Sequence, residues 1–114
     1  MTREQAISLL RRYRRDVYRY NSNYVLFAKR NTFFQTCVYG RFLIDELIRK
    51  IRHSAKDPIS VVSGIYSDLD EVLGDSDDDH FQTHRFAAMV EYEAGNILRY
   101  LRTVEKERNE DGKD

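Results

Sequence analysis

Residues 57–74 read DPISVVSGIYSDLDEVLG and contain the signals that begin and end a helix. Asp57 is of a type favoured just before the first turn, and Pro58 suits the first helical position because its missing N–H would have no partner there. Apolar residues then recur every three or four positions, which predicts one buried stripe. Gly74 is typical of the residue that ends a helix. The segment is therefore predicted to be an amphipathic helix.

The segment before it, residues 33–53, has the broadest apolar set in the chain, so we expect it to be the most buried helix. The apolar positions are Phe33, Phe34, Cys37, Val38, Phe42, Leu43, Ile44, Leu47, Ile48 and Ile51. Asn31 and Thr32 are suitable capping residues. Gly40 lies inside the segment, where glycine costs about 1 kcal/mol relative to alanine. We expect a neighbouring helix to approach closely at this position.

Two further helices are predicted at the ends of the chain. Thr2 and Gln5 form a capping-box pattern, which predicts a helix from Arg3 whose apolar stripe continues to Phe27. Residues 21–23 (Asn-Ser-Asn) are a weak point in it, where the helix is expected to bend or break. The last helix is predicted over residues 83–107.

These elements predict an all-α fold, a single-domain four-helix bundle over residues 1–108 in which sequential helices are antiparallel. A three-helix arrangement with a broken first helix is the alternative. Residues 109–114 contain no apolar side chain and are predicted to be a disordered tail. One proline and five glycines in 114 residues are too few turn signals for a β-sandwich or barrel.

Composition also bears on location. Cys37 is the only cysteine, so an internal disulfide is impossible and a buried, inert thiol is expected. The chain has no apolar run long enough for a membrane span and no secretory signal, so we expect a cytoplasmic protein without a membrane partner.

Charge is distributed unevenly although the net charge is zero. Residues 1–56 contain 13 Lys/Arg and 4 Asp/Glu, giving +9, whereas residues 57–114 contain 6 and 15, giving −9. Such asymmetry indicates either a charged interaction surface or two halves that neutralise each other in the fold. The two interpretations are equally compatible with the sequence.

Arginines are concentrated in the first predicted helix. Arg11, Arg15 and Arg19 are spaced by four residues, Arg12 broadens the stripe, and Tyr18 is close enough to stack on a base. These five residues are the predicted basic binding face. The alternative is an ordinary solvated helix face. Arginine favours an interface because its planar guanidinium suits carboxylate and phosphate.

Residues 75–80 form an acidic loop, and Asp75, Asp77, Asp78 and Asp79 are a second candidate binding site. Asp75, Asp77 and Asp79 match the first three ligand positions of a calcium-binding EF-hand loop. However, His80 replaces the required glycine, and Phe86 replaces the required glutamate. His80 and His84 have a spacing compatible with zinc, and Asp79 is a possible third ligand, but no other histidine or cysteine is near them in the predicted fold. We therefore predict no metal site.

Catalytic patterns are missing as well. There is no Glu-x-x-His pair for a di-iron centre and no glycine-rich phosphate loop. The Arg-x(4–6)-His pattern of HEPN-type ribonucleases is also missing, because the positions it requires before His53 hold Glu46, Leu47 and Ile48. We predict no enzyme activity, no catalytic residue and no cofactor.

One charged pair falls on apolar stripes. Arg41 continues the apolar face of residues 33–53, and Glu93 lies among apolar residues of the last helix. Because a buried charge needs a partner, we expect the two to approach each other as a structural pair.

The sequence therefore predicts a small non-enzymatic helical interaction protein. It would be a regulator, adaptor or inhibitor that docks a macromolecular partner, most simply another protein, through charged helix faces. A nucleic-acid-binding protein that uses the basic face is the alternative. Pairing of the two charged halves between copies would give a homo-oligomer. The size and simplicity fit a phage or mobile-element accessory protein.

Overall fold

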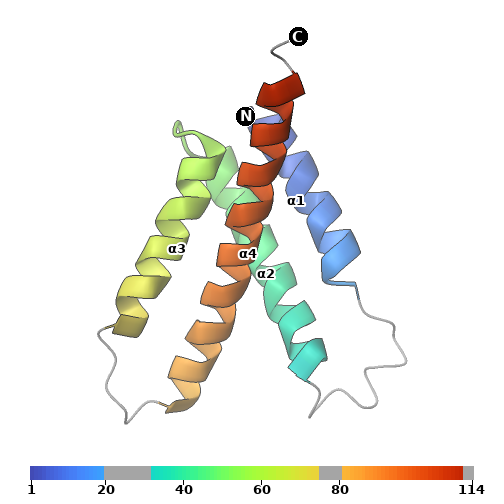
Figure 1. Cartoon of the computed structure of the whole chain (residues 1–114). Coiled ribbons are helices and arrows are strands. Elements are labelled where there is room, and N and C mark those ends of the chain that lie inside the picture. The colour runs from blue at the N-terminus through green and yellow to red at the C-terminus, as the bar shows by residue number, and fades with distance from the viewer. Residues whose placement is uncertain (20–31, 75–80, 112–114) are drawn as a thin grey trace.

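Helices dominate the computed structural model, which describes the backbone of residues 1–19, 32–74 and 81–111 and the side chains of residues 1–19, 37–71 and 87–110. Within these ranges there are four helices: α1 (Arg3–Val17), α2 (Thr32–Arg52), α3 (Pro58–Gly74) and α4 (Phe81–Asp111). Figure 1 shows that each helix runs antiparallel to its predecessor, and that the start of α1 and the end of α4 lie at the same end of the bundle. The predicted all-α four-helix bundle is confirmed.

The core lies between two helix pairs, because α3 packs most extensively on α4, and α1 on α2. As predicted, α2 is the most buried helix among the described side chains. Its buried members are Cys37, Leu43, Ile44, Leu47, Ile48 and Ile51. They meet Ala6 and Leu10 of α1, Val62 of α3, and Ala94, Ile97, Leu98 and Leu101 of α4.

Phe42 departs from the predicted buried set, because 70% of its surface is exposed. It lies three, four and seven residues before Asp45, Glu46 and Arg49, which are all exposed. Residues at these spacings share one face of a helix, so Phe42 belongs to the solvent face of α2. The prediction that Phe42 belongs to the core was wrong.

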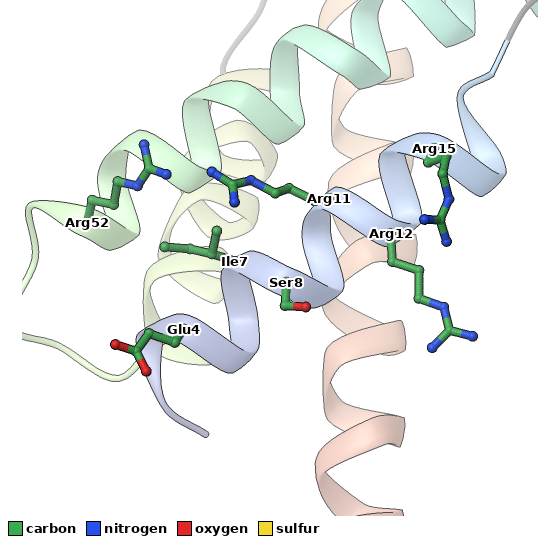
Figure 2. Close-up of a pocket in the computed structure, with 7 residues that line it drawn as sticks. All are labelled: Glu4, Ile7, Ser8, Arg11, Arg12, Arg15 and Arg52. Atoms are coloured by element: carbon green, nitrogen blue, oxygen red, sulfur yellow. The ribbon is translucent and has the colours of Figure 1, made fainter.

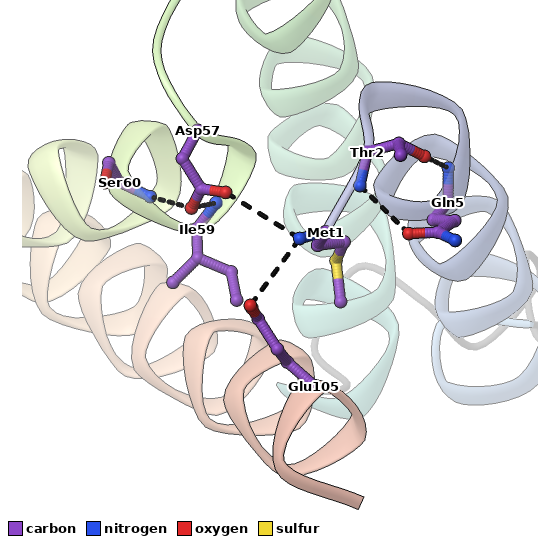
Figure 3. Close-up of polar contacts among 7 residues, drawn as sticks. All are labelled: Met1, Thr2, Gln5, Asp57, Ile59, Ser60 and Glu105. Atoms are coloured by element: carbon purple, nitrogen blue, oxygen red, sulfur yellow. Dashed lines mark hydrogen bonds and ion pairs between the residues drawn. The ribbon is translucent and has the colours of Figure 1, made fainter. Parts of the chain in front are cut away.

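The predicted caps at Thr2 and Asp57 are both present (Figure 3). The Thr2 hydroxyl accepts a hydrogen bond from the Gln5 amide at 3.1 Å, and the Thr2 amide donates to Gln5 Oε1 at 2.9 Å. The Asp57 carboxylate accepts from the amides of Ile59 at 3.0 Å and Ser60 at 3.4 Å. These bonds satisfy amides that have no partner within the helix.

The Met1 amine connects three helices at the same end of the bundle (Figure 3). It lies 3.5 Å from Glu105 Oε1 of α4 and 4.0 Å from Asp57 Oδ1 at the start of α3. The start of α1 is therefore held against the start of α3 and the end of α4.

Helix α1 ends at Val17, before the Asn-Ser-Asn run where a break was expected. The backbone leaves the helical conformation at Tyr18 (φ −103°, ψ 25°), whose amide donates the last helical bond to the Arg14 carbonyl at 3.1 Å. The side chain of Tyr18 is buried in the core, with 1% of its surface exposed. Helix α1 therefore ends at the point where the Tyr18 side chain enters the core. Residues 20–31, into which the helix was predicted to continue, lie outside the described range.

Gly40 confirms a close approach, but the neighbour differs from the prediction. A Cβ added at Gly40 would overlap the aromatic ring of Tyr18. The glycine of α2 therefore accommodates one side chain from the end of α1 rather than the backbone of another helix.

Helix α4 is longer than predicted at both ends. It includes Asn109, Glu110 and Asp111, which had been assigned to a disordered tail; these three residues continue a helix that is already anchored in the core by Leu101. Residues 112–114 lie outside the described range. Among the described helices, none combines the length and the apolar character that crossing a membrane requires.

Candidate functional site

The predicted basic face of α1 is exposed in the structure. Arg11, Arg12 and Arg15 all lie on the outer side of the helix (Figure 2). They line a shallow groove of about 840 Å³ together with Glu4, Ile7, Ser8 and Arg52. Arg11 points towards Arg52 of α2, whereas Arg12 and Arg15 point away from it (Figure 2). Four guanidinium groups thus border one groove.

A second groove of about 440 Å³ extends this positive region onto α2. Its lining residues are Arg11, Arg14, Asp45, Ile48, Arg49, Arg52 and His53. Arg11 and Arg52 belong to both grooves, so the two are continuous. We call the six residues Arg11, Arg12, Arg14, Arg15, Arg49 and Arg52 the arginine surface. Three of them, Arg11, Arg12 and Arg15, belong to the predicted face. Arg14 is a further arginine of α1, and Arg49 and Arg52 join the surface because α2 packs against α1.

The carboxylates that pair with the arginine surface come from the same two helices. Asp16 lies 3.8 Å from Arg12 and 3.1 Å from Arg15, while Asp45 Oδ1 lies 3.3 Å from Arg14 Nε. Glu46 Oε1 lies 2.5 Å from Arg49 Nη2. Within the described part of the chain, Arg11 and Arg52 have no ion-pair partner, and none of the six arginines pairs with a carboxylate of α3 or α4.

One of these pairs has a clear electrostatic signature. The hydrogen bond from Arg49 lowers the pKa of Glu46 and raises the pKa of Arg49. Both groups are fully solvated, so the pair adds little to stability. The pair holds the Arg49 guanidinium against α2. Arg11 and Arg52, which have no ion-pair partner among the described residues, keep their positive charge unpaired.

Two residues of the predicted basic face do not lie on the arginine surface. Tyr18 is buried, so it is not available to stack on a base. Arg19 is exposed but follows the end of α1, and its carbonyl oxygen accepts a weak hydrogen bond from the Cys37 thiol at 3.7 Å. Both residues were placed on the basic face by assuming a continuous helix, but α1 ends at Val17 and the helical spacing does not apply beyond it.

Tyr18 instead lies at the centre of a buried polar cluster. Its hydroxyl donates to Glu93 Oε2 at 2.5 Å, and its carbonyl accepts from Arg41 Nε at 2.7 Å. Glu93 is 8% exposed, whereas Arg41 is half-buried. Both members of the predicted pair therefore contact the same tyrosine, from opposite ends. A direct contact between their charged groups stays a prediction.

Two further tyrosines complete this cluster. The Tyr13 ring lies 5.5 Å from that of Tyr18 in an edge-to-face arrangement and 5.1 Å from that of Tyr100. Burial, and then the hydrogen bond to Glu93, raise the pKa of Tyr18 far above its ordinary value. Burial and Glu93 also raise the pKa of Tyr13. The Tyr18 phenol therefore stays protonated and serves as a structural donor to Glu93.

Cys37 has the environment expected of an inert thiol. Its side chain is 1% exposed, and burial raises its pKa, with Arg41 opposing and Glu93 adding to that effect. A buried thiol with a raised pKa is a poor nucleophile.

The other candidate residues lie where the structure gives no description. Asp75, Asp77, Asp78 and Asp79 fall within residues 75–80, and the side chain of His84 is also outside the described set. Among the described side chains, no three His, Cys, Asp or Glu residues are arranged to hold a metal ion.

Comparison with known proteins adds no further assignment, because no protein-family model, no curated protein and no solved structure matches the chain.

Proposed function

We propose that this chain is a small interaction protein without a catalytic role of its own, which docks an acidic macromolecular partner through the arginine surface. The proposal is supported by the location of the carboxylates that pair with the arginine surface. Asp16, Asp45 and Glu46 are on α1 and α2, so within the described residues no carboxylate of the acidic half pairs with these arginines. A regulator, adaptor or inhibitor would use such a surface to recognise an acidic protein.

Physical chemistry favours an interface of this composition. Guanidinium groups bind carboxylates in a bidentate manner and lose less hydration energy than ammonium groups when buried. Arginine is also enriched at protein interfaces. The apolar floor at Ile7 and Ile48 adds contact area between the charges. We therefore expect binding that depends on salt but retains an apolar component.

Nucleic-acid binding at the same surface is the second candidate. It is favoured by the four arginines that border one groove, since phosphate contacts supply most non-specific affinity. The buried position of Tyr18 removes the stacking partner that the sequence had suggested, which lowers the expected affinity for single strands.

The test compares two labelled probes by fluorescence anisotropy: a glutamate-rich peptide and short DNA and RNA, single- and double-stranded, at about 50 and 200 mM salt. In the variant, Arg11→Glu is combined with Arg15→Glu. Because both residues are exposed, the fold should persist. We expect peptide affinity to fall at least about tenfold, or ~1.4 kcal/mol. Lys56→Glu, exposed in the α2–α3 connection, is the matched control and should bind like the wild type.

Each outcome has a defined meaning. Peptide binding that is lost in the double variant and kept in the control supports the proposal. Tight binding of DNA or RNA, with a steep salt dependence and weak peptide binding, gives first place to the second candidate. Equal losses in variant and control would contradict a localised surface.

A further inference from the structure

Helices α3 and α4 pack side by side (Figure 1). A second group of cations lines a groove between them, in the half of the chain that is acidic by sequence count. Arg99, Arg102 and Lys106 are exposed on α4 at spacings of three and four residues, which places them on one helix face. They line a groove of about 310 Å³ together with Tyr66, Gly95, Leu98 and Thr103. No carboxylate lines this groove among the described residues.

Among the described residues, Arg99, Arg102 and Lys106 take part in no ion pair. Glu105, between them in sequence, points elsewhere, because its carboxylate lies 3.5 Å from the Met1 amine. A concentration of positive charge without counterions favours an anionic ligand.

An aromatic wall adjoins these cations. Tyr66 is half-buried and lies against α4 at Gly95, where an added Cβ would be 3.1 Å from the Tyr66 Cε2 atom. The glycine therefore lets the ring edge rest on the helix backbone. An aromatic ring beside guanidinium groups is the combination that recognises a base joined to phosphate.

The two ends of the groove differ in charge. Asp70 follows Tyr66 by one turn of α3, and Glu91 precedes Gly95 by one turn of α4. Burial, and then the interaction with the Asp70 carboxyl group, raise the pKa of Glu91. This acidic end repels phosphate, whereas the end bearing Arg102 and Lys106 attracts it.

We propose that the α3–α4 groove binds a nucleoside phosphate, with the base against Tyr66 and the phosphates on Arg99, Arg102 and Lys106. From Arg99 to Lys106 the helix rises about 10 Å, which suits two or more phosphates rather than one. The unit is either a free nucleotide or part of a nucleic-acid strand. This site is separate from the arginine surface and does not depend on its function.

Titration calorimetry of the full chain tests the proposal with three probes: ATP, inorganic tripolyphosphate, and a thymidine strand of about six nucleotides. We expect saturable ATP binding, with tripolyphosphate at least about tenfold weaker because it lacks a base. Arg102→Gln combined with Lys106→Gln should weaken ATP binding at least about tenfold. Arg108→Gln, on the same helix but outside the groove, should leave it unchanged.

Substitutions at Tyr66 test the aromatic wall. Tyr66→Phe keeps the ring and should keep ATP affinity, whereas Tyr66→Leu should reduce the preference for ATP over tripolyphosphate. Far-UV circular dichroism establishes that each variant is folded. The combined Arg11→Glu and Arg15→Glu variant should bind ATP normally, which separates this site from the arginine surface.

Three results would overturn the proposal: no saturable binding of either ATP or the strand, equal affinity for ATP and tripolyphosphate, or an equal loss in Arg108→Gln. A glutamate-rich peptide that binds the groove when ATP does not would also overturn it, in favour of an acidic peptide. If ATP binds, its affinity relative to the strand identifies which source of the nucleoside phosphate the groove prefers.

Discussion

Tyr18 connects several parts of the bundle through its backbone and its side chain. It terminates α1, fills the space above Gly40, donates to the buried carboxylate of Glu93, and accepts from Arg41 through its carbonyl. Sequence spacing placed it on a solvent face, because periodicity treats every position of a helix as continuing the same pattern. The residue leaves the helix, and so its direction is set by the core instead.

Removing only the Tyr18 hydroxyl should destabilise the protein. In Tyr18→Phe the ring still packs, but Glu93 keeps a buried carboxylate that has lost its donor at 2.5 Å. Leaving such a group without its hydrogen bond costs about 1–3 kcal/mol. Urea unfolding measures the change. Tyr92→Phe is the control, because Tyr92 is 70% exposed and should change stability by less than about 0.5 kcal/mol. Equal stability of Tyr18→Phe and wild type would show that the bond contributes nothing.

The helices themselves were largely predictable, because their starts depend on local chemistry. Thr2 and Asp57 form the expected caps, and the apolar stripes identified the buried faces. The end of α1, the exposure of Phe42 and the extra turn of α4 were not predictable, since each depends on contacts between helices or on their absence. Propensity and spacing carry no information about such contacts.

The difference between local signals and contacts between helices also explains which residues of the candidate sites could be predicted. Arg11, Arg12 and Arg15 could be read from one helix, whereas Arg52 joins them only through packing. Lys106 and its neighbouring arginines were hidden by a charge count over half of the chain, which averages a basic groove with acidic surroundings. A helix-face count of α4 alone would have detected them.

Glycines inside helices provide a test at the scale of the element. An added Cβ at Gly64, exposed on α3, would meet nothing within 4 Å. Gly64→Ala should therefore stabilise the protein by about 0.5–1 kcal/mol through the higher helix propensity of alanine. Gly40→Ala should destabilise it by about 1–3 kcal/mol, because the new methyl group overlaps the Tyr18 ring. Thermal unfolding of the two variants measures this; the same sign for both would contradict the described packing.

For the whole molecule, charge layout matters more than net charge. The acidic and basic halves do not cancel by direct pairing of the arginine surface with α3 or α4, within the part of the chain that the structure describes. Positive grooves occur instead on both helix pairs, α1–α2 and α3–α4. A protein of zero net charge can therefore present two localised anion-attracting surfaces.

Global stability should also depend on pH through Glu91. Its pKa is raised above the ordinary value of 4.5 by burial and by Asp70, so the native state binds more protons than the unfolded state in that range. The free energy of unfolding therefore falls as pH rises through the raised pKa. Glu91→Gln should be more stable than wild type at neutral pH, and the difference should vanish below about pH 4.

Unfolding in denaturant at several pH values measures this dependence. Glu107→Gln, exposed elsewhere on α4, is the control and should show no such pH-dependent gain. A gain for Glu91→Gln that persists at low pH would contradict an electrostatic origin, because the Glu91 carboxyl group is then neutral in both the folded and the unfolded state.

The contacting rings of Tyr13, Tyr18 and Tyr100 also give this protein an intrinsic spectroscopic probe. The chain has no tryptophan, so its near-ultraviolet circular dichroism comes mainly from tyrosines held in asymmetric surroundings. Two of the three rings belong to α1 and its end, the helix that carries most of the arginine surface. A ligand that shifts α1 should therefore change this band while the far-ultraviolet helix signal stays constant, and docking could be followed without attaching a label.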